Sequence, residues 1–100
     1  MILSENEDLK NLRNEIAKLT LEIIRLSGER LALARKIGEI KAQRGMEVED
    51  SKVEQELKNK VIELSREHNI DMDFSLKLLN LLMEESKRVQ RDVMGGKIKA

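Results

Sequence analysis

An arginine interrupts an otherwise apolar repeat in the first 45 residues of this 100-residue chain. The repeat advances by alternating steps of three and four, at Leu9, Leu12, Ile16, Leu19, Ile23, Leu26, Leu33, Ile37 and Ile40. Arg30 occupies the slot between Leu26 and Leu33. Because a buried guanidinium without a counter-charge is costly, Arg30 needs an anion. Two anions fit, a glutamate of a partner helix or an anionic ligand.

Lys41 lies on the same helical face as Arg30. It follows Arg30 by 11 residues, which is about 20° round a helix and about 16 Å along it. Two long side chains that lean toward each other on one face can hold a small anion between them. Such a pair of cations is therefore a candidate anion site.

Arg13 precedes Arg30 by about 25 Å on a helix and cannot reach this site from the same chain. If two copies of the helix pair antiparallel about residue 24, position 13 of one copy falls midway between Arg30 and Lys41 of the other. A symmetric dimer would then bring three cations together twice. From spacing alone, an exposed charge near the N-terminus is the simpler interpretation of Arg13.

Polar residues also interrupt the apolar faces farther along the chain. Ser86 and Gln90, four residues apart, stand where another leucine is expected, and Glu54 lies beside an apolar stripe. Simpler roles are a capping box for Glu54, a bond to the preceding turn for Ser86, and a bridge to a neighbouring helix for Gln90. A cationic and hydrogen-bonding set without a nucleophile–base pair suits binding, or electrostatic catalysis on an anion, better than hydrolysis.

The composition excludes several classes of protein. The 19 Lys and Arg residues balance 19 Asp and Glu residues, which argues against nucleic-acid binding by bulk charge. The chain has no cysteine, and one histidine, His68, cannot form a multi-histidine metal site. We therefore predict no metal and no cofactor. No apolar run approaches a membrane span and no signal peptide is visible, so we predict a soluble, cytoplasmic protein without a membrane partner.

Three helices must position these residues. The absence of proline and the many Leu, Ile, Glu and Lys residues predict an all-α chain. The first helix is predicted over 6–43, with a capping box from Ser4 to Glu7 and an end at Gly45. The second is capped by Asp50 or Ser51, with a second capping box from Ser51 to Glu54, and runs to about residue 67. Asp71 caps the third.

The predicted helices define one domain over 1–94 and a flexible tail over 95–100. The third helix has an apolar face that includes Phe74, which we place in the core. The first helix would be about 57 Å long, whereas a compact 100-residue globule has a radius of gyration of about 13 Å. It should therefore overhang its own domain and pair with a partner. Gly28 and Gly38 within it indicate either tolerance or a close approach of another backbone or a ligand.

The order of these residues resembles the all-α chorismate mutases of the shikimate pathway, in their monofunctional form. The resembling pieces are Leu12-Arg13-Asn-Glu-Ile16, Glu29-Arg30-Leu-Ala-Leu-Ala34, Ile37-Gly38-Glu-Ile-Lys41, Asp50 followed by Glu54, Glu67-His68-Asn-Ile-Asp71, and Glu85-Ser86-Lys-Arg-Val-Gln90. They run from about residue 6 to 92 in the family's order and spacing, without a gap.

The resemblance implies a three-helix protomer in an intertwined homodimer that converts chorismate to prephenate for phenylalanine and tyrosine synthesis. The site residues it implies lie mainly in one chain, with Arg13 contributed across the dimer. Carried over by position, Arg30 binds a substrate carboxylate, and Lys41 contacts a carboxylate and the ether oxygen. Gln90 donates to the ether oxygen, and Ser86 supports carboxylate binding.

The same resemblance implies that Asp50 and Glu54 hold the ring hydroxyl, Asp50 through its backbone. One position departs from the family pattern: an arginine often precedes the helix 2 glutamate, and here that residue is Val53. Two alternative functions stay open. One is an isochorismate-pyruvate lyase on the same fold, and the other is a non-catalytic helical dimerisation module.

Overall fold

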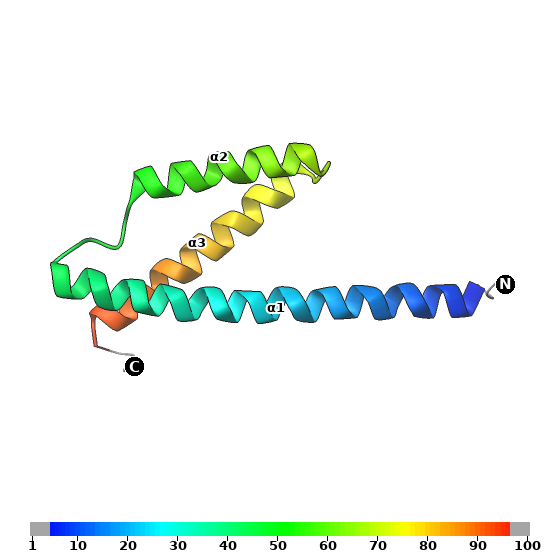
Figure 1. Cartoon of the computed structure of the whole chain (residues 1–100), viewed down its shortest axis with the longest axis horizontal. Helices are drawn as coiled ribbons and strands as arrows, with labels where there is room; N and C mark the ends of the chain where they lie inside the picture. Colours follow the sequence, from blue (N-terminus) through cyan, green and yellow to red (C-terminus); the bar gives the residue numbers. More distant parts are fainter. Residues whose placement is uncertain (1–4, 97–100) are drawn as a thin grey trace.

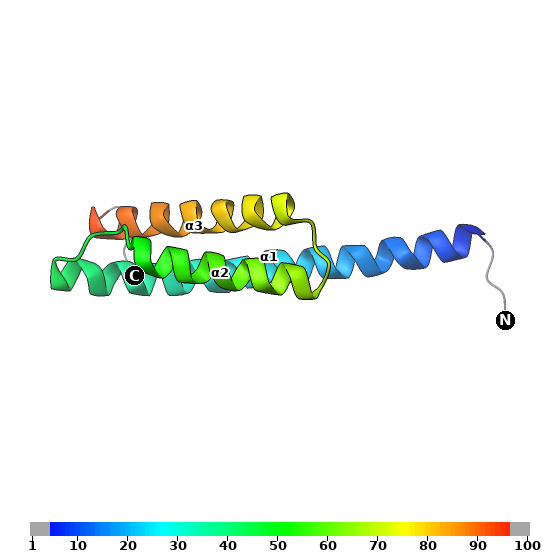
Figure 2. The same ribbon diagram turned by 90° about the horizontal axis from the view of Figure 1, so that it is seen from above.

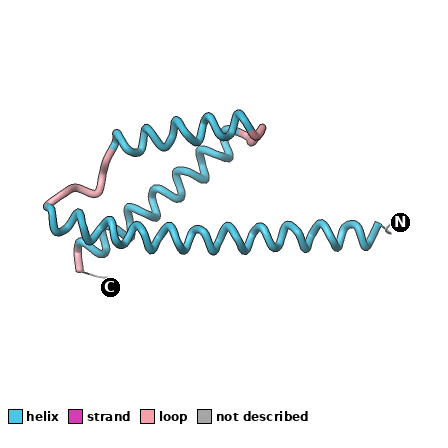
Figure 3. The backbone as a smooth tube through the Cα atoms, in the orientation of Figure 1, coloured by secondary structure: helices cyan, strands magenta, loops and turns pink. Residues whose placement is uncertain are grey.

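The computed structural model describes residues 5–96, and these residues form three helices with no strand between them. Helix α1 spans Glu5–Arg44, α2 spans Ser51–Glu67 and α3 spans Met72–Met94 (Figure 1). Short loops join them (Figure 3). The predicted all-α class, the helix order and the very long first helix are therefore confirmed.

Helix α1 ends where the sequence predicted. Gly45 adopts a left-handed conformation with φ of 63°, which glycine reaches without the steric cost that a side chain adds. The amide of Met46 then donates to the carbonyl of Lys41 at 2.8 Å, so the chain turns away from the helix axis. The predicted capping residue Ser4 and residues 97–100 of the predicted tail lie outside the described residues.

Aspartates cap the two shorter helices. The carboxylate of Asp50 accepts from the amide of Val53 at 3.2 Å, and that of Asp71 accepts from the amide of Phe74 at 2.9 Å. These bonds satisfy amides that have no partner within the helix. The predicted capping box from Ser51 to Glu54 is wrong, because Asp50 is the cap and Glu54 pairs with α3 instead.

Helix α3 is the middle helix of the protomer. It packs against both α1 and α2, which do not pack against each other. Figures 1 and 2 show α2 and α3 beside the C-terminal half of α1, while the N-terminal half projects beyond them. The described chain is accordingly elongated, with extents of 62 × 31 × 16 Å and a radius of gyration of 18.3 Å.

The protomer buries little apolar surface. Ala34, Leu79 and Val89 are its buried apolar side chains, whereas the apolar repeat of α1 is exposed along its length, with Ile16 at 65%. Fully burying one such side chain is worth about 1.5–3 kcal/mol, so this surface favours a partner. Phe74, predicted to lie in the core, is 57% exposed in this chain. That prediction is wrong for the single protomer, because α1 and α2 leave its face of α3 uncovered.

The membrane prediction concerns the same helices. Within residues 5–96, no helix is both long enough and apolar enough to cross a membrane.

Candidate active site

A cavity of about 310 Å³ lies where the C-terminal half of α1, the start of α2 and α3 come together. Its lining consists of Arg30, Ile37, Lys41, Val48, Asp50, Val53, Glu54, Leu57, Met83, Ser86, Lys87 and Gln90. Six of the seven predicted site residues are in this set. They come from positions as far apart in the chain as 30 and 90, so the fold alone brings them together.

Helix α1 supplies two cations to the cavity. The Arg30 guanidinium donates to the carbonyl of Leu82 on α3 at 3.1 Å, and the Lys41 ammonium donates to the carbonyl of Val48 at 2.8 Å. Both side chains are partly buried. Their partners are neutral carbonyl oxygens and not carboxylates, so within residues 5–96 no glutamate supplies the anion predicted for Arg30. Each cation also keeps further N–H groups that can bind an anionic ligand.

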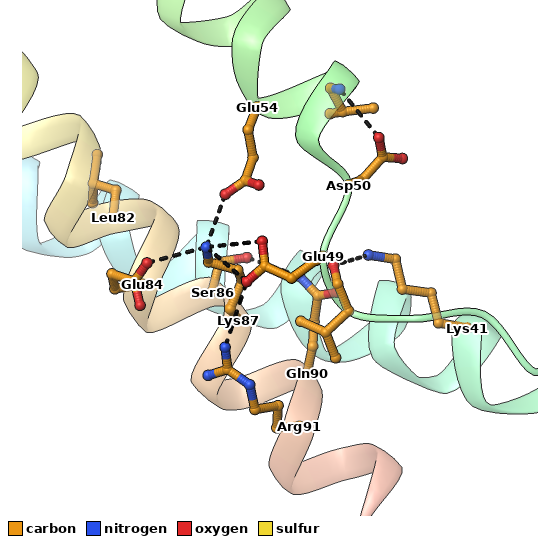
Figure 4. Close-up of polar contacts among 12 residues, drawn as sticks. Lys41, Glu49, Asp50, Glu54, Leu82, Glu84, Ser86, Lys87, Gln90 and Arg91 are labelled. Carbon is orange, nitrogen blue, oxygen red and sulfur yellow. Dashed lines mark hydrogen bonds and ion pairs between the residues drawn. The ribbon is translucent and has the colours of Figure 1, made fainter.

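Helix α3 supplies an amide and a hydroxyl. The Gln90 amide nitrogen donates to the Ser86 hydroxyl at 3.2 Å, one helical turn away (Figure 4). Gln90 is 6% exposed, and its Oε1 is buried without a hydrogen-bond partner among the described residues. A buried polar atom without a partner is costly, so this amide is poised for a further hydrogen bond.

Two acidic residues occupy the α2 side of the cavity. The Asp50 carboxylate caps α2 through Oδ1, and the Asp50 backbone carbonyl accepts from the amide of Glu54 at 3.0 Å, which leaves Oδ2 and the backbone N–H for a ligand. The Glu54 carboxylate faces α3 and pairs with the ammonium of Lys87 at 2.9 Å (Figure 4). Val53, where the resemblance favoured arginine, is uncharged and also lines the cavity.

Sequence reasoning missed Lys87. It lines the cavity between Ser86 and Gln90 and pairs with three carboxylates. Hydrogen bonds with Glu54 and then Glu84 raise the pKa of its ammonium, so Lys87 stays charged. The same ammonium lowers the pKa of Glu49. Lys87 precedes Gln90 by three residues and shares its helical face, but this spacing alone does not distinguish a residue of the cavity from one on a solvated face.

Arg13 is absent from the cavity. It is exposed on the projecting half of α1, and the helix separates it from Arg30 by about 25 Å. The predicted role of Arg13 therefore depends on a second copy of the chain.

Gly38 allows α1 and α3 to approach closely beside Gln90. A Cβ atom at Gly38 would lie 3.0 Å from the Cα and 3.2 Å from the carbonyl oxygen of Gln90, which is closer than such atoms normally come. At Gly28 a Cβ atom would meet nothing within 4 Å. The prediction of a close backbone approach is thus confirmed for Gly38, whereas Gly28 has no close neighbour within residues 5–96.

We expect Gly38→Ala to displace α3 at Gln90. Overpacking typically costs about 1–3 kcal/mol, of which the better helix propensity of alanine offsets about 1 kcal/mol. Displaced side chains in the cavity should also lower catalytic efficiency by about 10-fold. Urea unfolding and steady-state kinetics would measure both effects. Gly28→Ala is the matched control and should stabilise the helix slightly; equal effects of the two substitutions would contradict the packing argument.

The chemistry of the cavity follows from its lining. Arg30, Lys41 and Lys87 are cations, Gln90 is a neutral donor, and the apolar wall includes Ile37 and Leu57. The residues that line it include no cysteine or histidine and no hydroxyl paired with a base. Such a site can bind a small anion, hold it in one conformer and stabilise negative charge that develops on it.

Comparison with known proteins places this chain among chorismate mutases. Residues 12–91 match the family model for chorismate mutase type II. The chorismate mutase of Methanocaldococcus jannaschii is 31% identical over 88 residues, which cover 88% of this chain and 89% of that protein. The bifunctional chorismate mutase/prephenate dehydratase of Aquifex aeolicus is 41% identical over 61 residues, covering 61% of this chain and 17% of that protein. No solved structure matches the chain significantly.

Proposed function

This chain belongs to the chorismate mutase type II family, and on that basis we propose that it rearranges chorismate to prephenate in the cavity described above. In this intramolecular reaction one C–O bond breaks as one C–C bond forms. No proton transfer, nucleophile or cofactor is needed. The observation that carries the proposal is the convergence of Arg30, Lys41 and Gln90 on one cavity in a chain of this family.

Arg30 binds one carboxylate of the substrate. A guanidinium fork matches the geometry of a carboxylate and forms paired, charge-assisted hydrogen bonds. Its existing bond to the carbonyl of Leu82 anchors the side chain while other N–H groups remain for the ligand. Ser86 adds a hydroxyl to the same contact. Holding the flexible dianion in its compact reactive conformer is the orientation part of catalysis.

Lys41 and Gln90 stabilise the negative charge that grows on the ether oxygen as the C–O bond breaks. Lys41 also contacts a carboxylate, and its bond to the carbonyl of Val48 leaves two ammonium protons for the substrate. A half-turn of the Gln90 amide lets Oε1 accept the Ser86 hydroxyl, since the two amide ends differ only in hydrogen bonding. The unpartnered buried oxygen is then satisfied, and Nε2 is free to donate.

Glu54 and Asp50 hold the ring hydroxyl from the α2 side. Glu54 accepts through its carboxylate, whereas Asp50 donates through its backbone N–H, since its backbone carbonyl already accepts from the amide of Glu54 and its Oδ1 caps α2. These contacts fix the ring relative to the cations of α1.

The active protein is a homodimer in which the partner copy supplies Arg13. The exposed apolar repeat of α1 supports pairing of two copies along this helix. An antiparallel pair centred near residue 24 brings Arg13 of one copy between Arg30 and Lys41 of the other. Each dimer then has two equivalent sites, and Arg13 adds a fourth cation to the three that line each cavity.

Product identity tests the proposed reaction. We expect purified protein to consume chorismate and form prephenate in equal amount, as seen by proton NMR, and to leave isochorismate unchanged. Release of pyruvate from isochorismate would instead assign a lyase to this cavity. A folded dimer that alters neither compound would contradict catalysis.

Gln90→Glu tests the donor at the ether oxygen. A neutral amide donates at any pH, so the parent should show no loss of turnover from this position between roughly pH 5 and 8. A glutamate there donates only when protonated, and burial favours the protonated form. The variant should therefore be active mainly at low pH, as measured by kcat against pH. A profile that matches the parent's would exclude Gln90 as this donor.

A further inference from the structure

Lys87 occupies the cavity wall but has no part in the steps above. Its side chain is 13% exposed, and its Nζ lies 2.9 Å from Glu54, 3.0 Å from Glu84 and 3.1 Å from Glu49. These carboxylates belong to α2, to α3 itself and to the loop before α2, respectively (Figure 4). A single ammonium therefore ties the middle helix to both segments that close this side of the cavity.

The ion pair between Lys87 and Glu54 reduces the repulsion between the Glu54 carboxylate and an anionic substrate. A dianionic substrate must enter a cavity whose lining includes the carboxylates of Asp50 and Glu54. The α2 residues of that lining supply no cation, since Val53 and Leu57 are apolar. Within one chain the lining has three cations and two carboxylates, a net charge of +1, and without Lys87 these charges balance; Arg13 of a partner copy would add one positive charge in either case. Lys87 thus offsets the repulsion between Glu54 and the substrate.

The geometry also favours an indirect role for Lys87. Lys87 contacts Oε1 of Glu54, so Oε2 can accept a hydroxyl while the carboxylate is held in one rotamer. Three carboxylates surround the same ammonium, which leaves it few donors for a substrate carboxylate. Lys87 therefore acts on the ligand through Glu54.

We propose that Lys87 is a positioning residue, which neutralises Glu54 and aims its carboxylate at the ring hydroxyl of the substrate. The proposal rests on the proposed function and adds a residue to it. It predicts that the effect of Lys87 on catalysis depends on the Glu54 carboxylate.

The first experiment compares charge with side-chain bulk. Lys87→Met keeps an unbranched stem of similar length but removes the charge, and we expect kcat/KM for chorismate to fall by about 10–100-fold. Lys87→Arg keeps the charge and should keep most of the parental kcat/KM. Lys77→Met is the matched control, because Lys77 is an exposed lysine of the same helix outside the cavity lining. Equal activities of Lys87→Met and Lys77→Met would overturn the proposal.

The deciding experiment is a double-mutant cycle with Glu54→Gln, in the intact chain. If Lys87 acts through Glu54, adding Lys87→Met to Glu54→Gln should change kcat/KM by less than about 2-fold. If Lys87→Met lowers kcat/KM as much in the Glu54→Gln protein as in the parent, Lys87 does not act through Glu54 and the proposal is overturned. The double variant leaves two carboxylates, Glu49 and Glu84, where Lys87→Met leaves three, so we expect it to be less destabilised by like-charge repulsion than Lys87→Met alone.

Urea unfolding of the parent, the two single variants and the double variant measures the strength of the ion pair between Lys87 and Glu54. This measurement does not depend on enzyme activity. The two substitutions should be non-additive in the unfolding midpoint, because each removes one member of the same ion pair. Additive midpoints would overturn the proposal. Failure of the proposed function is recognised separately, since the parent protein would then leave chorismate unchanged.

Discussion

Arg30→Ala should lower kcat/KM for chorismate by about 10²–10³-fold, because it removes the guanidinium that pairs with a substrate carboxylate and orients the dianion for reaction. Arg30 is the cation that enters the cavity from within the apolar repeat of α1. Its bond to the carbonyl of Leu82 is charge-assisted, because the guanidinium donor is charged, and losing one such bond costs about 1.5–3 kcal/mol of stability. The variant should therefore still fold, with a modestly lower melting temperature, and fail in catalysis, which steady-state kinetics and thermal unfolding would separate.

Two further variants sharpen this result. Arg30→Lys keeps the charge but removes the fork that matches a carboxylate, so its activity should lie between those of the parent and Arg30→Ala. Arg25→Ala removes an exposed arginine of the same helix that pairs with Glu22 and Glu29, and it should be nearly as active as the parent. An Arg30→Ala protein as active as Arg25→Ala would refute the role of Arg30.

Mixing two inactive proteins should restore activity if Arg13 acts across the dimer. In a mixed dimer of Arg13→Ala and Lys41→Ala, one site combines an intact Lys41 with an intact Arg13 from the other chain. The second site lacks both side chains. Random reassociation of equal amounts makes half of the dimers mixed, so activity should reach about one quarter of the parental value. Refolding from urea followed by a chorismate assay would measure it.

The mixing experiment needs proof that mixed dimers form. Differently tagged chains, captured on one tag and detected by the other, provide that proof. Mixed dimers that form and stay inactive would contradict the assignment of Arg13. Strong activity of Arg13→Ala alone would do the same, because the exposed arginine would then have no part in the site.

Much of the fold could be predicted from the sequence because its determinants are local. Asp71 as the cap of α3 and Gly45 as the end of α1 depend on neighbouring backbone geometry alone. The same holds for the length of α1, where apolar residues at helical spacing continue without a breaker. The burial of Phe74 could not be predicted in this way, because it depends on which helices or subunits pack against its face of α3. Its face of α3 is open in a single protomer.

Residues of the candidate site could be predicted from the sequence where a polar side chain interrupts an apolar helical face. Arg30, Ser86 and Gln90 stood out for that reason, and the cavity includes all three. Lys87 did not stand out, because a lysine among charged neighbours has the pattern of a solvated face. Its partners Glu49 and Glu54 are 38 and 33 residues away along the chain, so only the packing of α3 reveals the cluster. For Glu54, the residues alone indicate a capping role, and it enters the predicted site through the family resemblance.

The most direct test of the central claim is the progress curve of chorismate absorbance after addition of the purified protein. We predict a rapid loss that a metal chelator leaves unchanged, and that slows by about 10²–10³-fold when Arg30→Ala replaces the parent. Absorbance that stays constant at high concentration of a folded, dimeric protein would contradict the account. So would an equal rate for the parent and Arg30→Ala, because the reaction would then take place outside this cavity.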